Sequence, residues 1–162
     1  MSLAIVPGSF DPMTLGHLDL IRTAAAHYDR VVVAVMINDA KRYLFDMQTR
    51  VAIAQATVSA LPSISVIADD GMLIDLYDRL GADAVCKGWR NETDLAYEQE
   101  MAEWNRAHNP RFQTVLYRSE GEHRSLSSTE VRSMIAQGAS LAPFVHAEAL
   151  PIITNYLSKE RV

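Results

Sequence analysis

The segment with the clearest potential for chemistry runs from Pro7 to His17 and reads Pro-Gly-Ser-Phe-Asp-Pro-Met-Thr-Leu-Gly-His. Gly8 lets the backbone turn without a Cβ, and the Ser9 hydroxyl can donate a hydrogen bond. Gly16 and His17 fall in the first turn of a predicted helix, where unpaired amides and the helix dipole favour an anion. An isolated histidine here would usually be a capping or core residue, but the complete string favours contact with a phosphate. The string is neither a GxGxxG dinucleotide fingerprint nor a P-loop, which would need Gly-Lys-Ser/Thr.

Two further segments place cations directly after predicted strands. Lys41 and Arg42 follow the second strand, and we interpret Arg42 as a solvated surface residue. Lys41 is interpreted as functional because it lies at the edge of the sheet where ligands bind. Lys87 and Arg90 follow the fourth strand and flank Gly88, which allows a ligand to approach the backbone closely.

The helix predicted from Glu92 to Ala107 carries an unusual face. Residues spaced i, i+3, i+4, i+7 and i+11 lie on one side of a helix. These are Asp94, Tyr97, Glu98, Met101 and Asn105. Polar groups on a face that should pack inward indicate a site or a subunit interface. Trp89, just before this helix, fits equally well as a packing residue or as the wall of a pocket.

The segment from His123 to Arg132 opens another predicted helix. Ser127 followed by Glu130 matches a capping box, so ordinary helix capping explains the pair. Hydroxyls and free amides at a helix start also bind phosphate, and this segment lies at the ligand edge. Capping and phosphate binding are compatible here, although a capping box alone is weak evidence for a site.

The elements that position these segments alternate between apolar runs and amphipathic stretches. Nearly continuous Val- and Ile-rich runs, typical of strands covered on both faces, occupy residues 3–6, 31–37, 64–68, 82–86 and 114–117. Helical patterns occupy residues 16–27, 47–61, 72–80, 92–107, 128–137 and 146–158. This alternation predicts an α/β fold: a single domain over residues 1–162 with a Rossmann-like, doubly wound, five-stranded parallel sheet and helices on both faces. Ligands of such sheets bind beyond the carboxyl ends of the strands.

Composition narrows the class of protein. The 162 residues are 49% hydrophobic and 22% charged, as in an ordinary globular domain. A formal net charge of -5 argues against a general nucleic-acid binder. Cys86 is the single cysteine, so no intrachain disulfide can form, and its apolar neighbours predict a core position. Residues 1–6 lack the basic region of a signal peptide and no apolar run reaches membrane-spanning length, so we expect a soluble, cytoplasmic protein.

Taken together, these segments resemble the bacterial phosphopantetheine adenylyltransferases, within the nucleotidyltransferase superfamily that carries a His-x-Gly-His or Thr-x-Gly-His signature. The resemblance covers nearly the whole chain. Beyond the first string and its Thr14-Leu15-Gly16-His17, it includes Lys41, Gly88-Trp89-Arg90, Asp94 with Tyr97-Glu98, Asn105-Arg106 and Ser127-Ser128-Thr129. The first string is specific to the superfamily, whereas the chain length and the Asp-x-x-Tyr-Glu region narrow the match to this family.

The resemblance implies an enzyme that converts ATP and 4'-phosphopantetheine to dephospho-CoA and pyrophosphate with Mg²⁺, commonly as a homohexamer. It implies His17 as transition-state stabiliser, with Lys41 and Arg90 also in the catalytic set. The implied phosphopantetheine contacts are Ser9, Lys41, Leu73 and Lys87. The implied ATP contacts are Ser9, Phe10, His17, Gly88, Trp89, Arg90, Glu98, His123, Arg124, Ser125, Leu126, Ser127, Ser128 and Thr129. No metal ligand is assigned, because the phosphates of ATP would hold most of the Mg²⁺ shell; Asp11 and Glu98 are candidates.

Two positions depart from the family pattern. Lys87 stands where arginine is usual, which keeps the charge but loses the planar fork that holds phosphate with two bonds. Ala96 stands where an acidic residue is usual, between Asp94 and Tyr97. The first change bears on acceptor affinity and the second on subunit contacts or local structure.

Other functions compete with this reading. The closest is a related enzyme that uses nicotinate mononucleotide as acceptor or CTP as donor, and the region from Leu73 to Glu98 argues against it. A phospho-receiver domain would need a carboxylate cluster at the strand ends, whereas Asp69 and Asp70 follow the third strand without one. A catalytically inactive nucleotide sensor is the remaining alternative.

Overall fold

The computed structural model describes residues 1–160. In this part of the chain, strands and helices alternate up to α5, and α6 follows α5 directly. The five strands and six helices of residues 1–160 are β1 (Leu3–Gly8), α1 (Leu15–His27), β2 (Arg30–Met36), α2 (Met47–Thr57), β3 (Ile64–Asp69), α3 (Leu73–Leu80), β4 (Ala84–Trp89), α4 (Glu92–His108), β5 (Thr114–Arg118), α5 (Ser128–Ala136) and α6 (Leu150–Glu160). The predicted doubly wound parallel sheet is therefore confirmed. Two strands end two or more residues later than expected, because β1 reaches Gly8 and β4 reaches Trp89.

The strand order is β3-β2-β1-β4-β5, and every pairing is parallel. The chain winds outward from β1 to β2 and β3, and then returns to the other side of β1 with β4. β1 and β2 pair over six residue pairs, but β1 and β4 pair only at Ala4–Ala84 and Ile5–Val85. β1 and β4 therefore separate toward their carboxyl ends. The direction in which strands are added to the sheet reverses between these two strands, and such sheets open a ligand crevice at this point.

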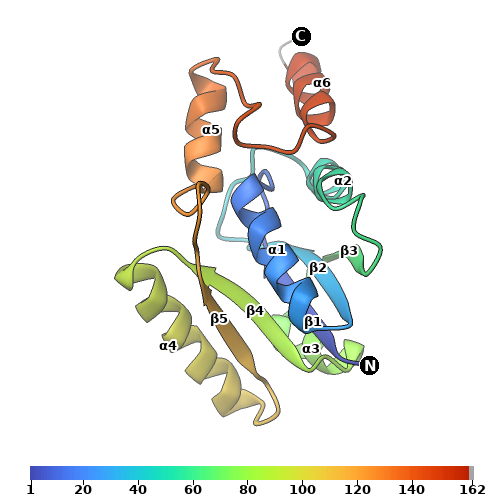
Figure 1. Ribbon diagram of the computed structural model, residues 1–162, viewed down its shortest axis with the longest axis vertical. Coiled ribbons are helices and arrows are strands. Elements are labelled where there is room, and N and C mark those ends of the chain that lie inside the picture. Colours follow the sequence, from blue (N-terminus) through green and yellow to red (C-terminus); the bar gives the residue numbers. More distant parts are fainter. Residues whose placement is uncertain (161–162) are drawn as a thin grey trace.

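Alternating strand residues supply two hydrophobic clusters, one on each face of the sheet. Ala4 and Val6 of β1 join the larger cluster, with core residues from α1, α2, α5 and α6. Ile5 joins the smaller cluster, with Leu76 and Tyr77 of α3. Figure 1 shows α1 in front of the sheet and α3 behind it. Because both faces are covered, the inner strands β1 and β2 are apolar over most of their length, as the sequence pattern predicted.

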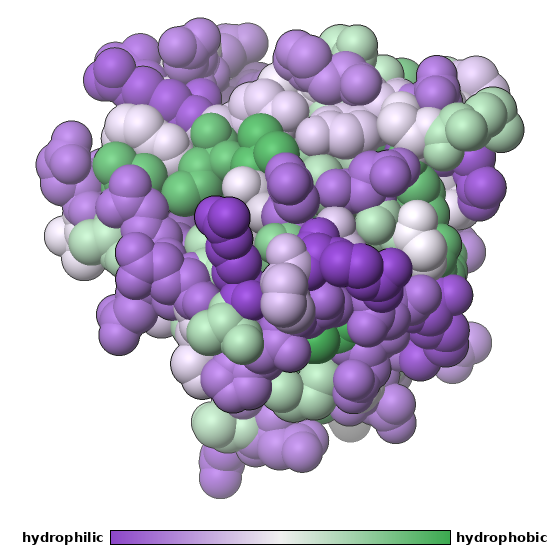
Figure 2. Space-filling model, turned by 90° about the horizontal axis from the view of Figure 1, so that it is seen from below, coloured by the Kyte–Doolittle hydropathy of each residue, from purple (hydrophilic) through white to green (hydrophobic). Residues whose placement is uncertain are grey.

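Two further expectations can be compared with the structure. Cys86 is fully buried in the larger cluster, as predicted. Among residues 1–160, no helix is both long and apolar enough to cross a membrane. Viewed from below Figure 1, the surface is mainly hydrophilic, with hydrophobic side chains gathered in smaller patches (Figure 2).

Candidate active site

A polar cleft of 540 Å³ opens at the carboxyl ends of β1 and β4. Its walls come from the last residues of these strands, the loop after β1, and the first turns of α1, α4 and α5. Most residues assigned from the sequence line it: Ser9, Phe10, His17, Lys41, Lys87, Gly88, Arg90, Glu98, His123, Leu126, Ser127, Ser128 and Thr129. Segments far apart in the sequence therefore meet at one place.

His17 is held at the start of α1 by a reciprocal cap. The Thr14 side chain accepts a hydrogen bond from the backbone N–H of His17 at 3.3 Å. In return, the backbone N–H of Thr14 donates to Nδ1 of His17 at 3.0 Å. Because Nδ1 accepts this bond, the neutral imidazole carries its proton on Nε2. The capping and functional interpretations of His17 are thus compatible, since the cap sets the tautomer and leaves Nε2–H as a donor.

A histidine that binds phosphate is usually pictured as positively charged, but His17 is held in its neutral form. Burial, together with the nearby positive charges of Lys87 and Arg90, lowers its pKa from 6.5 to about 4. At neutral pH the ring is therefore uncharged. It can donate one directed hydrogen bond to an oxyanion, but the positive charge in the cleft comes from other residues.

The loop after β1 packs tightly around Phe10. Phe10 has a φ of 48°, in the left-handed region, and its ring meets the ring of His17 edge-on with centroids 5.0 Å apart. A Cβ at Gly8 would lie 2.9 Å from the Phe10 ring, so only glycine fits there. This explains in packing terms why glycine and phenylalanine occur together in the first string.

Asp11 has a structural role in this loop. Its two carboxylate oxygens accept the backbone N–H groups of Leu44 at 2.8 Å and Phe45 at 2.9 Å. The side chain is 3% exposed. Asp11 therefore joins the loop after β1 to the start of α2, and its oxygens are already engaged by protein donors.

Side chains of α5 donate hydrogen bonds to the loop after β1. The Ser128 hydroxyl donates to the Pro12 carbonyl at 2.7 Å. Arg132 donates from Nη1 to the Asp11 carbonyl at 2.9 Å and from Nη2 to Thr129 Oγ1 at 3.1 Å. Ser127 caps the helix by accepting the N–H of Glu130 at 3.3 Å, as its sequence position predicted. Arg132 lines the cleft but was not assigned to it from sequence; its position one turn after Ser128 and Thr129 was the available signal.

The β4–α4 side of the cleft carries paired charges. The Lys87 ammonium lies 3.5 Å from the Glu98 carboxylate. Arg90 contacts Asp94 at 2.9 Å through Nε and also donates its backbone N–H to the same carboxylate. Lys87 belongs to β4 rather than to a loop after it, which corrects the sequence-based placement. The residues after Val85 remain within hydrogen-bonding reach of β5, because the pairing continues to Trp89–Arg118.

An apolar groove of 350 Å³ continues from the cleft between β1, β2, α3 and α4. Ser9, Lys41 and Lys87 line both spaces. The remaining wall of the groove is mostly apolar: Pro7, Met36, Ile37, Met72, Leu73, Ile74, Met101 and Trp104. Leu73 thus lies in the groove rather than in the polar cleft.

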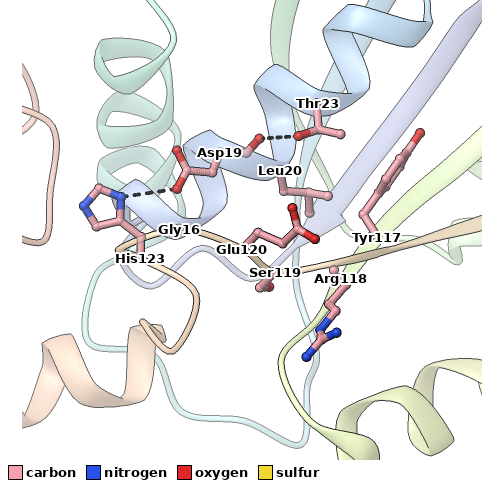
Figure 3. A pocket seen from close by; sticks show the side chains of 10 residues that line it. Gly16, Asp19, Leu20, Thr23, Tyr117, Arg118, Ser119, Glu120 and His123 are labelled. Carbon is pink, nitrogen blue, oxygen red and sulfur yellow. Dashed lines mark hydrogen bonds and ion pairs between the residues drawn. The ribbon is translucent and has the colours of Figure 1, made fainter.

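A second cavity of 290 Å³ opens on the other side, between α1 and the end of β5 (Figure 3). It shares Gly16, Leu20, Gly88, Ser119 and His123 with the main cleft. His123 Nδ1 lies 3.2 Å from the Asp19 carboxylate at its rim. The cleft therefore extends in two directions, toward this cavity and toward the apolar groove.

Three assigned residues lie outside these cavities. The Trp89 ring faces the Arg118 guanidinium at 5.7 Å, so a packing position describes it. Arg124 donates to the Gly121 carbonyl, and both Arg124 and Ser125 are exposed. The structure does not bring these three side chains to the cleft walls.

The donor set does not form a metal cage. Among residues 1–160, no three His, Cys, Asp or Glu side chains are grouped so that they could hold a metal ion. Of the two candidates, Asp11 is engaged by backbone amides and Glu98 faces Lys87. This arrangement fits only a cation that takes most of its oxygen ligands from phosphate.

Comparisons with known proteins give a consistent result. A model of the cytidylyltransferase-like family matches residues 5–134. A phosphopantetheine adenylyltransferase of Limosilactobacillus reuteri (strain DSM 20016) is 40% identical over 162 residues, which are 100% of this chain and 91% of the relative. The enzyme of the same name from Lachnoclostridium phytofermentans is 35% identical over 161 residues, 99% of each chain. The solved structure of a "Putative Nicotinate-nucleotide Adenylyltransferase" from Vibrio parahaemolyticus superposes with a TM-score of 0.74 over 96% of this chain and 93% of that one. At 18% identity this last likeness shows the fold alone.

Proposed function

The chain belongs to the phosphopantetheine adenylyltransferases of the cytidylyltransferase-like family, and we propose that its cleft transfers the adenylyl group of ATP to 4'-phosphopantetheine by direct in-line attack. The products are dephospho-CoA and pyrophosphate, and the reaction is a step of coenzyme A biosynthesis. The chain is accordingly a nucleotidyltransferase.

One observation carries the assignment of substrates to the cleft. The polar space around His17 continues directly into an apolar groove, and Ser9, Lys41 and Lys87 line both. An acceptor with a phosphate at one end and a long uncharged chain at the other fits this shape. The two lysines would hold the phosphate, and the groove at Leu73 and Met101 would take the pantetheine chain.

The reaction needs positioning more than a protein nucleophile. An acceptor phosphate oxygen, already ionised at neutral pH, would attack the α-phosphorus of ATP, and the bond to the pyrophosphate oxygen would break. No covalent enzyme intermediate is required. His17 would donate from Nε2 to an oxygen on the α-phosphate, where negative charge increases in the transition state. The fixed tautomer of His17 supports this role.

Charge in the cleft would be balanced by the catalytic pair Lys41 and Arg90, with Lys87 and Arg132 beside them. All four side chains line the cleft. The amides at the starts of α1 and α5 add oriented partial charge. Mg²⁺ belongs to this proposal as an ion that arrives with ATP and further neutralises the phosphates.

The ATP contacts proposed are those carried over from the family: Ser9, Phe10, His17, Gly88, Trp89, Arg90, Glu98, His123, Arg124, Ser125, Leu126, Ser127, Ser128 and Thr129. Support is strongest for the members that line the cleft. For Trp89, Arg124 and Ser125, contact would require that they move toward the nucleotide or present backbone groups to it.

Assembly and location complete the proposal. A homohexamer is proposed from the family resemblance, and the exposed Tyr97, Met101 and Trp104 on α4 support an apolar contact between copies. A cytoplasmic location is proposed because ATP is the donor.

The test is pyrophosphate release from ATP and Mg²⁺ with 4'-phosphopantetheine, with nicotinate mononucleotide, and without acceptor. Release with phosphopantetheine alone is expected. Release only with nicotinate mononucleotide would keep the adenylyltransferase chemistry but overturn the acceptor. Replacing ATP by CTP checks the donor in the same assay.

A further inference from the structure

A buried arginine lies directly beneath the cleft. Arg50 of α2 is 2% exposed and donates from Nη1 to the carbonyls of Ser9 at 2.8 Å and Met36 at 3.2 Å. Its Nε donates to the Phe45 carbonyl at 3.2 Å. Among residues 1–160, no carboxylate forms an ion pair with it. Arg50 therefore fastens together the ends of β1 and β2, the two strands whose following segments carry Ser9 and Lys41.

Tyr43 covers this arginine. The guanidinium carbon of Arg50 lies 3.9 Å from the centre of the Tyr43 ring, a close cation–π contact. A planar guanidinium that is already fixed by three carbonyls gives the ring a rigid platform. The position of Tyr43 relative to Ser9 is consequently set through Arg50.

The hydroxyl of Tyr43 holds the segment that leads to Lys41. It accepts the backbone N–H of Asn38 at 2.6 Å and faces the Asn38 carbonyl at 3.3 Å. The same carbonyl accepts the N–H of Lys41 at 2.9 Å, and the Asn38 side chain accepts the N–H of Ala40 at 3.0 Å. One hydroxyl therefore secures both backbone groups of the residue on which the turn to Lys41 closes.

We propose that Tyr43 is a positioning residue for the acceptor phosphate: with Arg50 it forms a brace that fixes the backbone of Lys41 relative to Ser9. This inference rests on the proposed function, in which Ser9 and Lys41 hold 4'-phosphopantetheine. It goes beyond the family resemblance, which assigns no role to Tyr43 or Arg50.

The physical reason is conformational entropy. Residues 37–42 are exposed, and the described structure holds them by few contacts besides the Tyr43 hydroxyl. Without the hydroxyl, this segment would have to become ordered when the acceptor binds, and acceptor affinity would fall by the cost of that ordering. ATP affinity would change little, because most of the proposed nucleotide contacts lie at the start of α1, from Gly88 to Glu98, and from His123 to Thr129, outside residues 37–42.

Tyr43→Phe separates the two parts of the brace, because it removes the hydroxyl and keeps the ring on Arg50. We expect KM for 4'-phosphopantetheine to rise about threefold to tenfold, the usual range for a lost hydrogen bond, with KM for ATP nearly constant. Because Lys41 also belongs to the proposed catalytic pair, kcat should fall as well, but by less than the acceptor KM rises. Tyr43→Leu removes the ring contact as well and should raise acceptor KM further. Tyr28→Phe is the matched control, because Tyr28 follows α1 and lines none of the described cavities.

A double-mutant cycle distinguishes positioning from general destabilisation. If Tyr43 acts through Lys41, then Tyr43→Phe should have no further effect on acceptor KM in a Lys41→Ala background. An effect of equal size in both backgrounds would overturn the inference, as would an unchanged acceptor KM in the single variant.

Amide hydrogen exchange tests the brace without relying on catalysis. The N–H groups of Ala40 and Lys41 should exchange faster in Tyr43→Phe than in the wild type or in Tyr28→Phe. Wild-type protein that rejects 4'-phosphopantetheine would defeat the proposed function but would leave this exchange measurement intact. Unchanged exchange in Tyr43→Phe would defeat the brace itself, whatever the acceptor.

Discussion

The two flanks of the cleft present different kinds of groups to an anion. On the α1–α5 flank, the groups are mostly uncharged: the Nε2–H of His17, the hydroxyls of Ser128 and Thr129, and backbone amides. Among the described residues that line this flank, Arg132 alone brings a full positive charge, and two acceptors already fix it. On the β4–α4 flank, Lys87 and Arg90 bring full charges, each beside a carboxylate.

The difference shows how an acidic chain can bind two anionic substrates. Oriented dipoles on one flank need no counter-ion and impose direction on the phosphate they meet. Paired cations on the other flank stay in place without substrate, and their pairing limits the charge that either substrate meets. The dipolar flank should therefore control turnover, and Lys87 on the paired flank should control acceptor affinity.

The largest expected effect is on the dipolar flank. His17→Ala removes the donor that we propose for the reacting phosphate, and kcat should fall by about two to three orders of magnitude with smaller changes in both KM values. Steady-state pyrophosphate release measures this, with Lys159→Ala on α6 as a remote control. Near-normal turnover of the variant would show that His17 is not the transition-state stabiliser.

Arg132 should come next. Arg132→Met removes the bond to the Asp11 carbonyl and the charge facing the nucleotide, and kcat/KM for ATP should fall about tenfold to a hundredfold. Arg79→Met is a matched control, because Arg79 pairs with Asp69 and is 61% exposed. If Arg132→Met and Arg79→Met behave alike in ATP titrations, the dipolar flank does not depend on its one cation.

The pH dependence of stability should report the neutral state of His17. Its pKa is about 4 in the fold and 6.5 for an unperturbed histidine, so between these limits the unfolded chain binds a proton that the folded chain does not. The free energy of unfolding should therefore fall as pH decreases from about 6.5 to about 4, by about 1–2 kcal/mol after allowance for partial exposure.

Chemical denaturation of the wild type and of His17→Gln, at several pH values, isolates this contribution. The difference in stability between the two proteins should shift in favour of the variant as pH falls. A difference that stays constant with pH would mean that His17 titrates normally, and the argument for an uncharged donor would fail.

The smallest expected effect tests the paired flank. Lys87→Arg restores the planar fork that the family usually has, so acceptor KM should fall about threefold while ATP KM stays the same. The measurement is an acceptor titration at saturating ATP. A change confined to ATP would place Lys87 on the nucleotide side and overturn its role in acceptor affinity.

Much of the fold followed from local pattern. Val- and Ile-rich runs separated by amphipathic stretches predicted all five strands and six helices, because burial on both faces demands continuous apolar residues. Strand ends were less certain, and β4 extends to Trp89 because β5 continues to pair with it. The length of β4 depends on how far β5 pairs with it, so the residues of β4 alone do not predict where the strand ends.

The cleft was predicted in outline for a similar reason. Parallel strands bring their carboxyl ends to one edge, so the sequence alone groups Ser9, Lys41 and Lys87. Arg132 was missed because its role depends on a carbonyl more than a hundred residues away in the chain. Tyr43 and Arg50 were missed because neither residue type, at that spacing, resembles a known motif.

The sequence by itself determined the fold class, the family and the edge of the sheet at which the site lies, because these depend on periodicity and on short contiguous strings. Only the tertiary structure decided the state of each group in the site. The cap from Thr14 selects the tautomer of His17, burial beside Lys87 and Arg90 removes its charge, and backbone amides occupy the oxygens of Asp11. Protonation, pairing and orientation arise from neighbours in space, and a linear pattern of residue types does not specify them.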